Sequence, residues 1–260
     1  MKFLSALAVA STVSVSVFVA CATTDTGRKQ LNFVPEGQMN AMGEDAYQEM
    51  LATTKISTNK NLTDAIVSIG KNIAKASGKN YDWEFTLFDS KDVNAFCLPG
   101  GKVGVYTGLV PVAKTNAAMA AVLGHEVAHA VAQHSAERVS QSLLVMGGLI
   151  AADTAMKDAK NRQTIMAALG LGAQVGILMP YGRTQESEAD EIGLEYMARA
   201  GFDPREAVAL WQRMGELGGS PPEILSTHPD PTNRAKALEQ LMPSALKIYN
   251  ASVKIPTVLL

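Results

Sequence analysis

The chain has 260 residues, of which 47% are hydrophobic, and this is enough for one sizeable domain with a packed core. Extensive disorder is therefore not expected. Its 23 basic and 25 acidic residues give a formal net charge of -2 and are spread along the sequence. This even charge distribution excludes the basic blocks expected of a nucleic-acid-binding protein.

The first segment, residues 1–20, is typical of a secretory signal. After Met1 and Lys2 it is apolar, rich in small residues and free of charge. Small residues before Cys21 resemble a bacterial lipobox, in which the signal is removed and the cysteine carries the lipid. We expect lipidation of Cys21, with ordinary cleavage or retention of the segment as the alternatives. Ala22 stands where an Asp would resemble an inner-membrane retention signal, so the outer membrane is favoured.

Cysteine usage constrains how the fold is held together. If Cys21 is acylated, Cys97 has no partner in the chain, so no disulfide framework is expected even in an oxidising compartment. We expect Cys97 to behave as a buried small hydrophobe and not as a reactive thiol.

Residues 21–35 are polar without an apolar period, which predicts a tether leading into a single domain over 36–260. Apolar residues at three- and four-residue spacing then predict two helices. Next, alternation of apolar and polar residues and a Pro-Gly-Gly turn predict three short strands. The expected helices are 36–53 and 62–76. One expected strand begins near residue 81, and the other two cover 93–98 and 102–106.

The remainder of the chain is predicted to be helical, so the expected fold class is mainly α with a small antiparallel sheet (α+β). The expected helices are 116–141, 142–155, 163–178, 184–199, 204–214 and 231–241. Two apolar stretches, 143–152 and 165–179, are shorter than the roughly 20 residues of a membrane span. Both are rich in Gly and Ala, so we expect a packed hairpin beside the helix 116–141, with membrane insertion as the alternative.

The segment His125-Glu126-Val127-Ala128-His129 predicts a metal site. Four residues turn a helix by about 400°, so both imidazoles project from one face and can share one ion. Zinc suits two neutral imidazoles and a carboxylate with an open fourth position, and Glu126 is placed to activate the attacking water as a base. Two hydrogen-bonded core histidines are the alternative interpretation.

A third metal ligand has to come from elsewhere in the chain, and Glu186 is the best candidate. Asp190 lies one turn further on the same helix face and could accept a hydrogen bond from the outer nitrogen of His125. Glu188 lies about 200° around the helix from Glu186, so we expect it to face away from the metal and be solvated.

The two other histidines are judged by position. His134 lies nine residues after His125, about 900° of helix rotation, which predicts a capping or packing role on the side away from the metal. His228 precedes a helix and could reach the cleft from the far side. There it would either stabilise the oxyanion of the transition state or cover the metal in a resting form.

Four motifs, taken in order, are similar to those of zinc metallopeptidases of the HtpX and CAAX prenyl endopeptidase type, which are HExxH gluzincins. The similarity is strongest to the periplasmic lipoprotein branch without a helical-repeat domain. The motifs are Asn94-Ala95-Phe96 with Pro99-Gly100-Gly101; His125 to His129; Glu186 to Asp190 with Gly193 and Gly201-Phe202-Asp203-Pro204; and Ser226 to Pro229 with Arg234.

This resemblance implies a zincin-like fold with one zinc ion per chain. It also implies that the strand with Asn94, Ala95 and Phe96 is an edge strand that pairs with the substrate backbone. The alternative for these residues is a turn and core packing. Arg234 would orient His228 or a substrate carbonyl, with a surface ion pair as the alternative.

We therefore expect a zinc-dependent metalloendopeptidase. By resemblance, it would act on unfolded or misassembled envelope proteins, outer-membrane proteins among them, from a lipid anchor on the periplasmic face of the outer membrane. One alternative is a cleft-based chaperone or quality-control protein with little proteolysis. A di-iron oxidase is the other, because Glu126 and His129 form a Glu-x-x-His pair, but no second such pair occurs in the chain.

Overall fold

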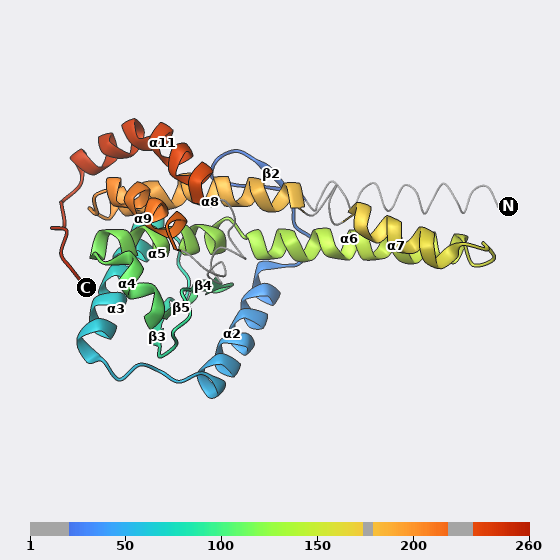
Figure 1. Ribbon diagram of the computed structural model, residues 1–260, viewed down its shortest axis with the longest axis horizontal. Helices are drawn as coiled ribbons and strands as arrows, with labels where there is room; N and C mark the ends of the chain where they lie inside the picture. Colours follow the sequence, from blue (N-terminus) through green and yellow to red (C-terminus); the bar gives the residue numbers. More distant parts are fainter. Residues whose placement is uncertain (1–20, 174–178, 218–230) are drawn as a thin grey trace. The chain divides into compact units, whose positions relative to one another are not determined.

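A computed structural model describes residues 21–173, 179–217 and 231–260 (Figure 1). The chain divides into two compact units, and we describe each by itself. The smaller unit comprises the chain up to Gln38 together with Ser135–Tyr181, and the larger unit comprises Met39–His134 and Gly182–Leu260. This division runs through the range 36–260, for which the sequence predicts one domain. The predicted signal segment lies outside the described residues.

In the smaller unit, a strand pair is held against a long helix. Strand β1 (Cys21–Thr23) pairs antiparallel with β2 (Lys29–Leu31), where the sequence predicts only a polar tether. Helix α6 (His134–Ala155) carries Glu137, whose two carboxylate oxygens each accept a 2.8 Å hydrogen bond from the Arg28 guanidinium. Because Glu137 is fully buried, this two-point ion pair fixes the strand pair on α6.

Helices α6 and α7 (Arg162–Ala173) contain the two apolar stretches of the sequence. Near their connection Arg162 Nε donates a 2.6 Å hydrogen bond to Asp153. Helix α7 has no buried residue, and the packing of this hairpin beside the helix 116–141 stays a prediction. Within the described ranges, no helix has both the length and the hydropathy needed to cross a membrane.

The larger unit contains a three-stranded sheet in the order β3-β5-β4. Strand β3 (Glu84–Phe88) pairs parallel with β5 (Lys102–Tyr106), and β4 (Ala95–Leu98) pairs antiparallel with β5. The prediction of a mainly α fold with a small sheet is confirmed, but the sheet is mixed and not wholly antiparallel. The reason is that β5 lies in the middle of the sheet. It therefore pairs with β3 as well as with β4, its partner in the hairpin.

Helices cover this sheet and build the core. The elements are α2 (Glu36–Thr53), α3 (Lys60–Ser77), η1 (Thr107–Leu109), α4 (Val110–Ala113), α5 (Asn116–Val131), α8 (Met179–Arg199), α9 (Arg205–Gly215) and α11 (Pro231–Ala251). Helix α3 places Ile66, Ile69 and Ile73 in the core and packs against α5 and β3. Helix α9 packs against both α5 and α11 (Figure 1).

The backbones of α5 and α8 approach each other closely at two glycines. A Cβ atom added to Gly124 would lie 2.7 Å from the carbonyl oxygen of Gly193, and one added to Gly193 would lie 2.7 Å from the backbone nitrogen of His125. No real Cβ atom tolerates such a contact, so this crossing requires glycine on both helices. It brings the segment around His125 next to the one around Asp190.

The largest difference from the predicted elements concerns the helix expected over 116–141. Helix α5 ends at Val131, Gln133 adopts a left-handed backbone with φ of 57°, and α6 begins at His134. The remaining helices follow the prediction to within a few residues at most ends. Helix α11 is the exception, because it continues through Pro243 to Ala251.

Candidate metal centre

Three predicted ligands meet in the larger unit. His125 and His129 on α5 have their Nε2 atoms 3.0 Å apart. From α8, one carboxylate oxygen of Glu186 lies 3.3 Å from His125 Nε2 and the other lies 3.3 Å from His129 Nε2. All three residues are buried. The three side chains could hold one metal ion, since their ligand atoms all lie within 4.8 Å of one another.

The spacing of these atoms agrees with a tetrahedral zinc site. Zinc binds imidazole nitrogen and carboxylate oxygen at about 2.0–2.1 Å, and a tetrahedron of that size has edges of roughly 3.3 Å. The two imidazole nitrogens are 3.0 Å apart, and each lies 3.3 Å from a different oxygen of Glu186, which is close to that edge length. Two imidazoles and one carboxylate also match the donor set of a hydrolytic zinc site, in which the fourth position takes water or substrate.

The outer nitrogen of His125 faces a buried ion pair. Its Nδ1 lies 3.1 Å from Asp190 Oδ1, and Arg234 on α11 donates to both Asp190 oxygens, 2.8 Å from Nε to Oδ2. The Arg234 guanidinium also lies 3.5 Å from the centre of the Trp211 ring, a cation–π contact. Asp190 thus accepts hydrogen bonds from two sides.

These contacts set the pKa values of Asp190 and His125. Burial would raise the pKa of Asp190, but the Arg234 charge and the hydrogen bonds from His125 and Arg234 lower it below its usual value. Burial and Arg234 act to lower the pKa of His125, but the hydrogen bonds to Asp190 and Glu186 outweigh them and raise it to about 9. A metal ion at Nε2 would replace the proton that these carboxylates favour.

The outer nitrogen of His129 has a different partner, His134, the first residue of α6. The two Nδ1 atoms are 2.8 Å apart, and His134 Nε2 lies 3.1 Å from Glu188 Oε2. His134 is fully buried and Glu188 is 5% exposed. Burial lowers the pKa of His129 well below its usual value, so its imidazole is neutral as a metal ligand requires.

The direction of this chain of hydrogen bonds follows from its carboxylate end. An ionised carboxylate only accepts, so a neutral His134 beside an ionised Glu188 donates from Nε2 and its Nδ1 is left as an acceptor. His129 then donates from Nδ1 to His134, which leaves the lone pair of His129 Nε2 facing the candidate metal position. The Glu188–His134 pair therefore selects the tautomer of His129 that can bind a metal.

The predicted side for His134 and the predicted solvation of Glu188 are wrong. The rotation argument for His134 assumed a continuous helix, but the break at Gln133 turns the chain back toward His129. No Gly or Pro marks that break, so the sequence carries no local signal for it. Glu188 does lie on another side of α8 from Glu186, but that side is covered by protein and not by solvent.

Arg234 does not form a surface ion pair. It is 6% exposed, and its partner Asp190 is 5% exposed, so that alternative is wrong. The ion pair joins residues 44 positions apart in the sequence, and the Trp211 ring packs against the Arg234 guanidinium. His228, predicted to reach the cleft, lies outside the described residues.

The predicted substrate strand is at the edge of the sheet. Strand β4 has β5 on one side and no partner strand on the other within the described ranges. Ala95 is buried, and Phe96 contacts the rings of Phe88 and Tyr106. The side chain of Asn94 accepts a 2.9 Å hydrogen bond from the backbone N–H of Ala95. Only the backbone of this strand is therefore suited to pair with another chain.

Glu126, the predicted base, follows His125 on α5 and is 3% exposed. Cys97 on β4 is a free thiol. Burial raises the pKa of Cys97 well above its usual value, and the nearby Glu126 carboxylate raises it further. This agrees with the expectation that Cys97 is not a reactive thiol.

Residues 59–242 match the model of peptidase family M48. The chain is 35% identical over 234 residues to the mitochondrial metalloendopeptidase OMA1 of Schizosaccharomyces pombe, covering 85% of this chain and 66% of that protein. It is 38% identical over 227 residues to the OMA1 protein of Arabidopsis thaliana, covering 83% and 44%. Identity to the beta-barrel assembly-enhancing protease of Escherichia coli is 26% over 219 residues, covering 81% and 45%. The chain thus spans no more than 66% of the length of these relatives.

Proposed function

This chain belongs to peptidase family M48, and we propose on that basis that it is a zinc-dependent endopeptidase. The observation that carries the proposal is the convergence of His125 and His129 from one helix with Glu186 from another. The two imidazole nitrogens are 3.0 Å apart and each has a Glu186 oxygen 3.3 Å away, and a buried carboxylate, Glu126, follows the first histidine directly.

The roles of the residues follow from their chemistry. A zinc ion held by His125, His129 and Glu186 would supply Lewis acidity to the scissile carbonyl and to water. Glu126 takes a proton from the attacking water and later passes it to the leaving amine. The strand β4 binds the substrate backbone as an added strand, which fits a peptide of loose sequence preference. His228 acts from the far side of the cleft, on the oxyanion or as a cover of the metal.

Two pairs of residues act on the metal ligands and not on the substrate. Asp190, held by Arg234, accepts from His125 Nδ1, and Glu188 acts through His134 on His129 Nδ1. Each pair keeps the Nε2 lone pair of its histidine directed at the metal and makes that histidine a better donor. The two supporting pairs are independent, since they share no residue.

The setting we propose is the bacterial envelope. Cys21 would carry a lipid on the periplasmic face of the outer membrane, and unfolded or misassembled envelope proteins would be the substrates. This proposal is supported by the signal-like residues 1–20 and by the name of the Escherichia coli relative, a beta-barrel assembly-enhancing protease. The narrower similarity to the HtpX and CAAX prenyl endopeptidase type and to its lipoprotein branch belongs to the same proposal.

Digestion of unfolded casein by the full chain tests the chemistry and the metal together. We expect cleavage that a chelator abolishes and that added zinc restores. Glu126→Gln should retain one zinc per chain but lose about 10²–10⁴-fold in turnover, because the base is gone while the ligands remain. His129→Ala should lose the zinc itself. Equal loss of zinc in both variants, or cleavage unaffected by the chelator, would contradict these roles.

A further inference from the structure

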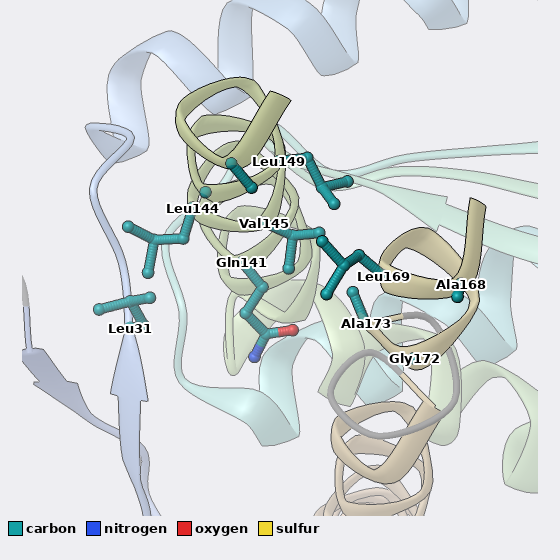
Figure 2. A pocket seen from close by; sticks show the side chains of 11 residues that line it. Leu31, Gln141, Leu144, Val145, Leu149, Ala168, Leu169, Gly172 and Ala173 are labelled. Atoms are coloured by element: carbon teal, nitrogen blue, oxygen red, sulfur yellow. The ribbon is translucent and has the colours of Figure 1, made fainter. Parts of the chain in front are cut away.

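A second site lies in the smaller unit and includes no residue of the metal centre. A cavity of about 540 Å³ opens between helices α6 and α7 and strand β2 (Figure 2). Its volume is in the range of small-molecule binding sites. The residues that line it are Leu31, Gln141, Leu144, Val145, Gly148, Leu149, Ala152, Ala168, Leu169, Gly172 and Ala173.

The lining contains one polar side chain, Gln141, and no charged one. Gln141 is 5% exposed, and its Nε2 atom is buried without a hydrogen-bond partner among the described residues. A buried amide N–H₂ that donates to nothing costs about 1–3 kcal/mol, so such groups normally have a partner. The ligand that fits is therefore apolar along most of its length and offers one hydrogen-bond acceptor to Gln141.

The same cavity adjoins the residue that the sequence predicts to be lipidated. Leu31 lines the cavity, and in the antiparallel pair of β1 and β2 it is the register partner of Cys21. The buried ion pair of Arg28 with Glu137 holds this strand pair against α6. The backbone at position 21 is therefore paired with a residue of the cavity wall.

The outer surface of the two helices is apolar as well. Residues 139–152 of α6 and 163–173 of α7 carry no charge. Leu144, Met146, Ile150 and Leu171 are each more than half exposed. Exposed apolar side chains in such number mark an interaction site and are unusual on a surface that meets only water.

We propose that this cavity binds the acyl chain of a lipid, with the ester or amide carbonyl of that lipid accepting a hydrogen bond from Gln141 Nε2. An acyl chain needs no polar partner along its length, which matches the lining, and its carbonyl supplies the acceptor that Gln141 lacks. Two sources share this chemistry: a membrane phospholipid and the acyl chains that Cys21 would carry.

Quenching of an introduced tryptophan by brominated phospholipid tests the proposal on the full chain. Leu149→Trp places the reporter in the cavity, and Met42→Trp on α2 is the control at an exposed apolar residue of the larger unit. In vesicles of phosphatidylglycerol with brominated acyl chains, we expect the emission added by Leu149→Trp to fall at least about twofold relative to unbrominated vesicles. The Met42→Trp emission should not change.

Substitutions at two neighbouring glycines distinguish lipid binding in the cavity from general adsorption of the protein to the vesicle. Gly148 lines the cavity and Gly147 does not, and a Cβ at either would meet no atom within 4 Å. Added to the reporter chain, Gly148→Leu should fill the cavity and abolish quenching, whereas Gly147→Leu should leave it intact. Gln141→Leu should weaken binding several-fold by removing the donor.

A Cys21→Ser background identifies the source of the acyl chain. If the reporter is quenched both in the chain with Cys21 and in Cys21→Ser, the cavity binds a membrane phospholipid. If it is quenched only in Cys21→Ser, the chain's own acyl group fills the cavity when Cys21 is present. Absence of quenching in both backgrounds, or equal quenching in the two glycine variants, overturns the proposal. Zinc content and casein cleavage by Gly148→Leu should match those of the unaltered chain, so failure here is distinct from failure of the proposed peptidase.

Discussion

Helices α5 and α7 are built from similar residues but have opposite surroundings. Both are rich in Ala and also contain Met, Leu and Gly, yet every residue from Asn116 to Ala130 of α5 is buried, while none of α7 is. The difference shows that composition determines which helices could be buried, whereas the neighbouring elements decide which helices are. The buried helix carries the metal ligands, and the exposed one lines the cavity that we assign to a lipid.

The buried polar groups of the two regions can also be compared. Around α5, the buried side chains of His125, His129 and Asp190 have hydrogen-bond partners in the larger unit. On α6, Gln141 Nε2 has none within the described part of the chain. Arg234 Nη1, 3.5 Å from a Glu186 oxygen, also has no hydrogen-bond partner among the described residues, so each region leaves one buried donor that a ligand could satisfy.

The largest effect should come from adding a side chain at the close contact between α5 and α8. Gly124→Ala puts a methyl group where only 2.7 Å separates it from the Gly193 carbonyl oxygen, so α5 and α8 must move apart. We expect a loss of roughly 3 kcal/mol or more in the free energy of unfolding, and weaker zinc binding because Glu186 moves with α8. Urea denaturation and zinc titration measure the two effects. Unchanged stability would show that the crossing is looser than described.

A smaller loss is expected when the support of a ligand is removed without changing shape. Glu188→Gln replaces the carboxylate that orients His134 by an amide of the same size, so the preferred tautomer of His129 is no longer fixed. We expect zinc affinity to fall about 10–100-fold. Competition with a chromogenic chelator measures it, and Glu191→Gln, at an exposed position of the same helix, is the matched control. Equal affinity in the two variants would rule out the proposed role of Glu188.

The alkylation rate of the Cys97 thiol measures how far the pKa of this thiol is raised. Because burial and the Glu126 carboxylate raise its pKa, the thiolate needed for alkylation is scarce at pH 8 and increases only as the pH rises above the usual thiol range. In a Cys21→Ser chain, we expect alkylation by iodoacetamide at least about tenfold slower than in the unfolded chain. Glu126→Gln should speed the reaction, since it removes the negative charge that raises the pKa. Equal rates in folded and unfolded chains would contradict the raised pKa of Cys97.

The smallest effect should be found at an exposed position of α6. Gly147→Ala on α6 meets no atom within 4 Å, so the substitution only exchanges a poor helix former for a good one. We expect the free energy of unfolding to rise by up to about 1 kcal/mol. Denaturation under the conditions used for Gly124→Ala gives the direct contrast. A clear loss of stability would mean that another part of the protein covers this face.

The parts of the site that follow from one regular element could be predicted from the sequence. His125 and His129 lie one helical turn apart, and Glu186 and Asp190 share one face of another helix, so periodicity alone pairs them. Their meeting agrees with that prediction. The mainly α fold and most helix ends were accessible for the same reason, since apolar periodicity is a local signal.

Contacts that depend on irregular backbone or on distant partners could not be predicted in this way. His134 reaches His129 because the chain breaks at Gln133, where no Gly or Pro indicates a turn. Glu188 is buried because protein covers the second side of α8, which the sequence of α8 does not show. The parallel pairing of β3 with β5 likewise depends on which strand of the hairpin turns inward.

The central claim is that His125, His129 and Glu186 hold one zinc ion. X-ray absorption at the zinc edge of the zinc-loaded full chain, together with metal analysis, tests it most directly. We predict one zinc per chain in a four-coordinate shell with two imidazole nitrogens, the remaining ligands being oxygen at about 2.0–2.2 Å. Glu186→Ala should lose a protein oxygen ligand and most of the affinity. A sulfur ligand, a shell with fewer than two imidazoles, or full zinc binding by Glu186→Ala would contradict the claim.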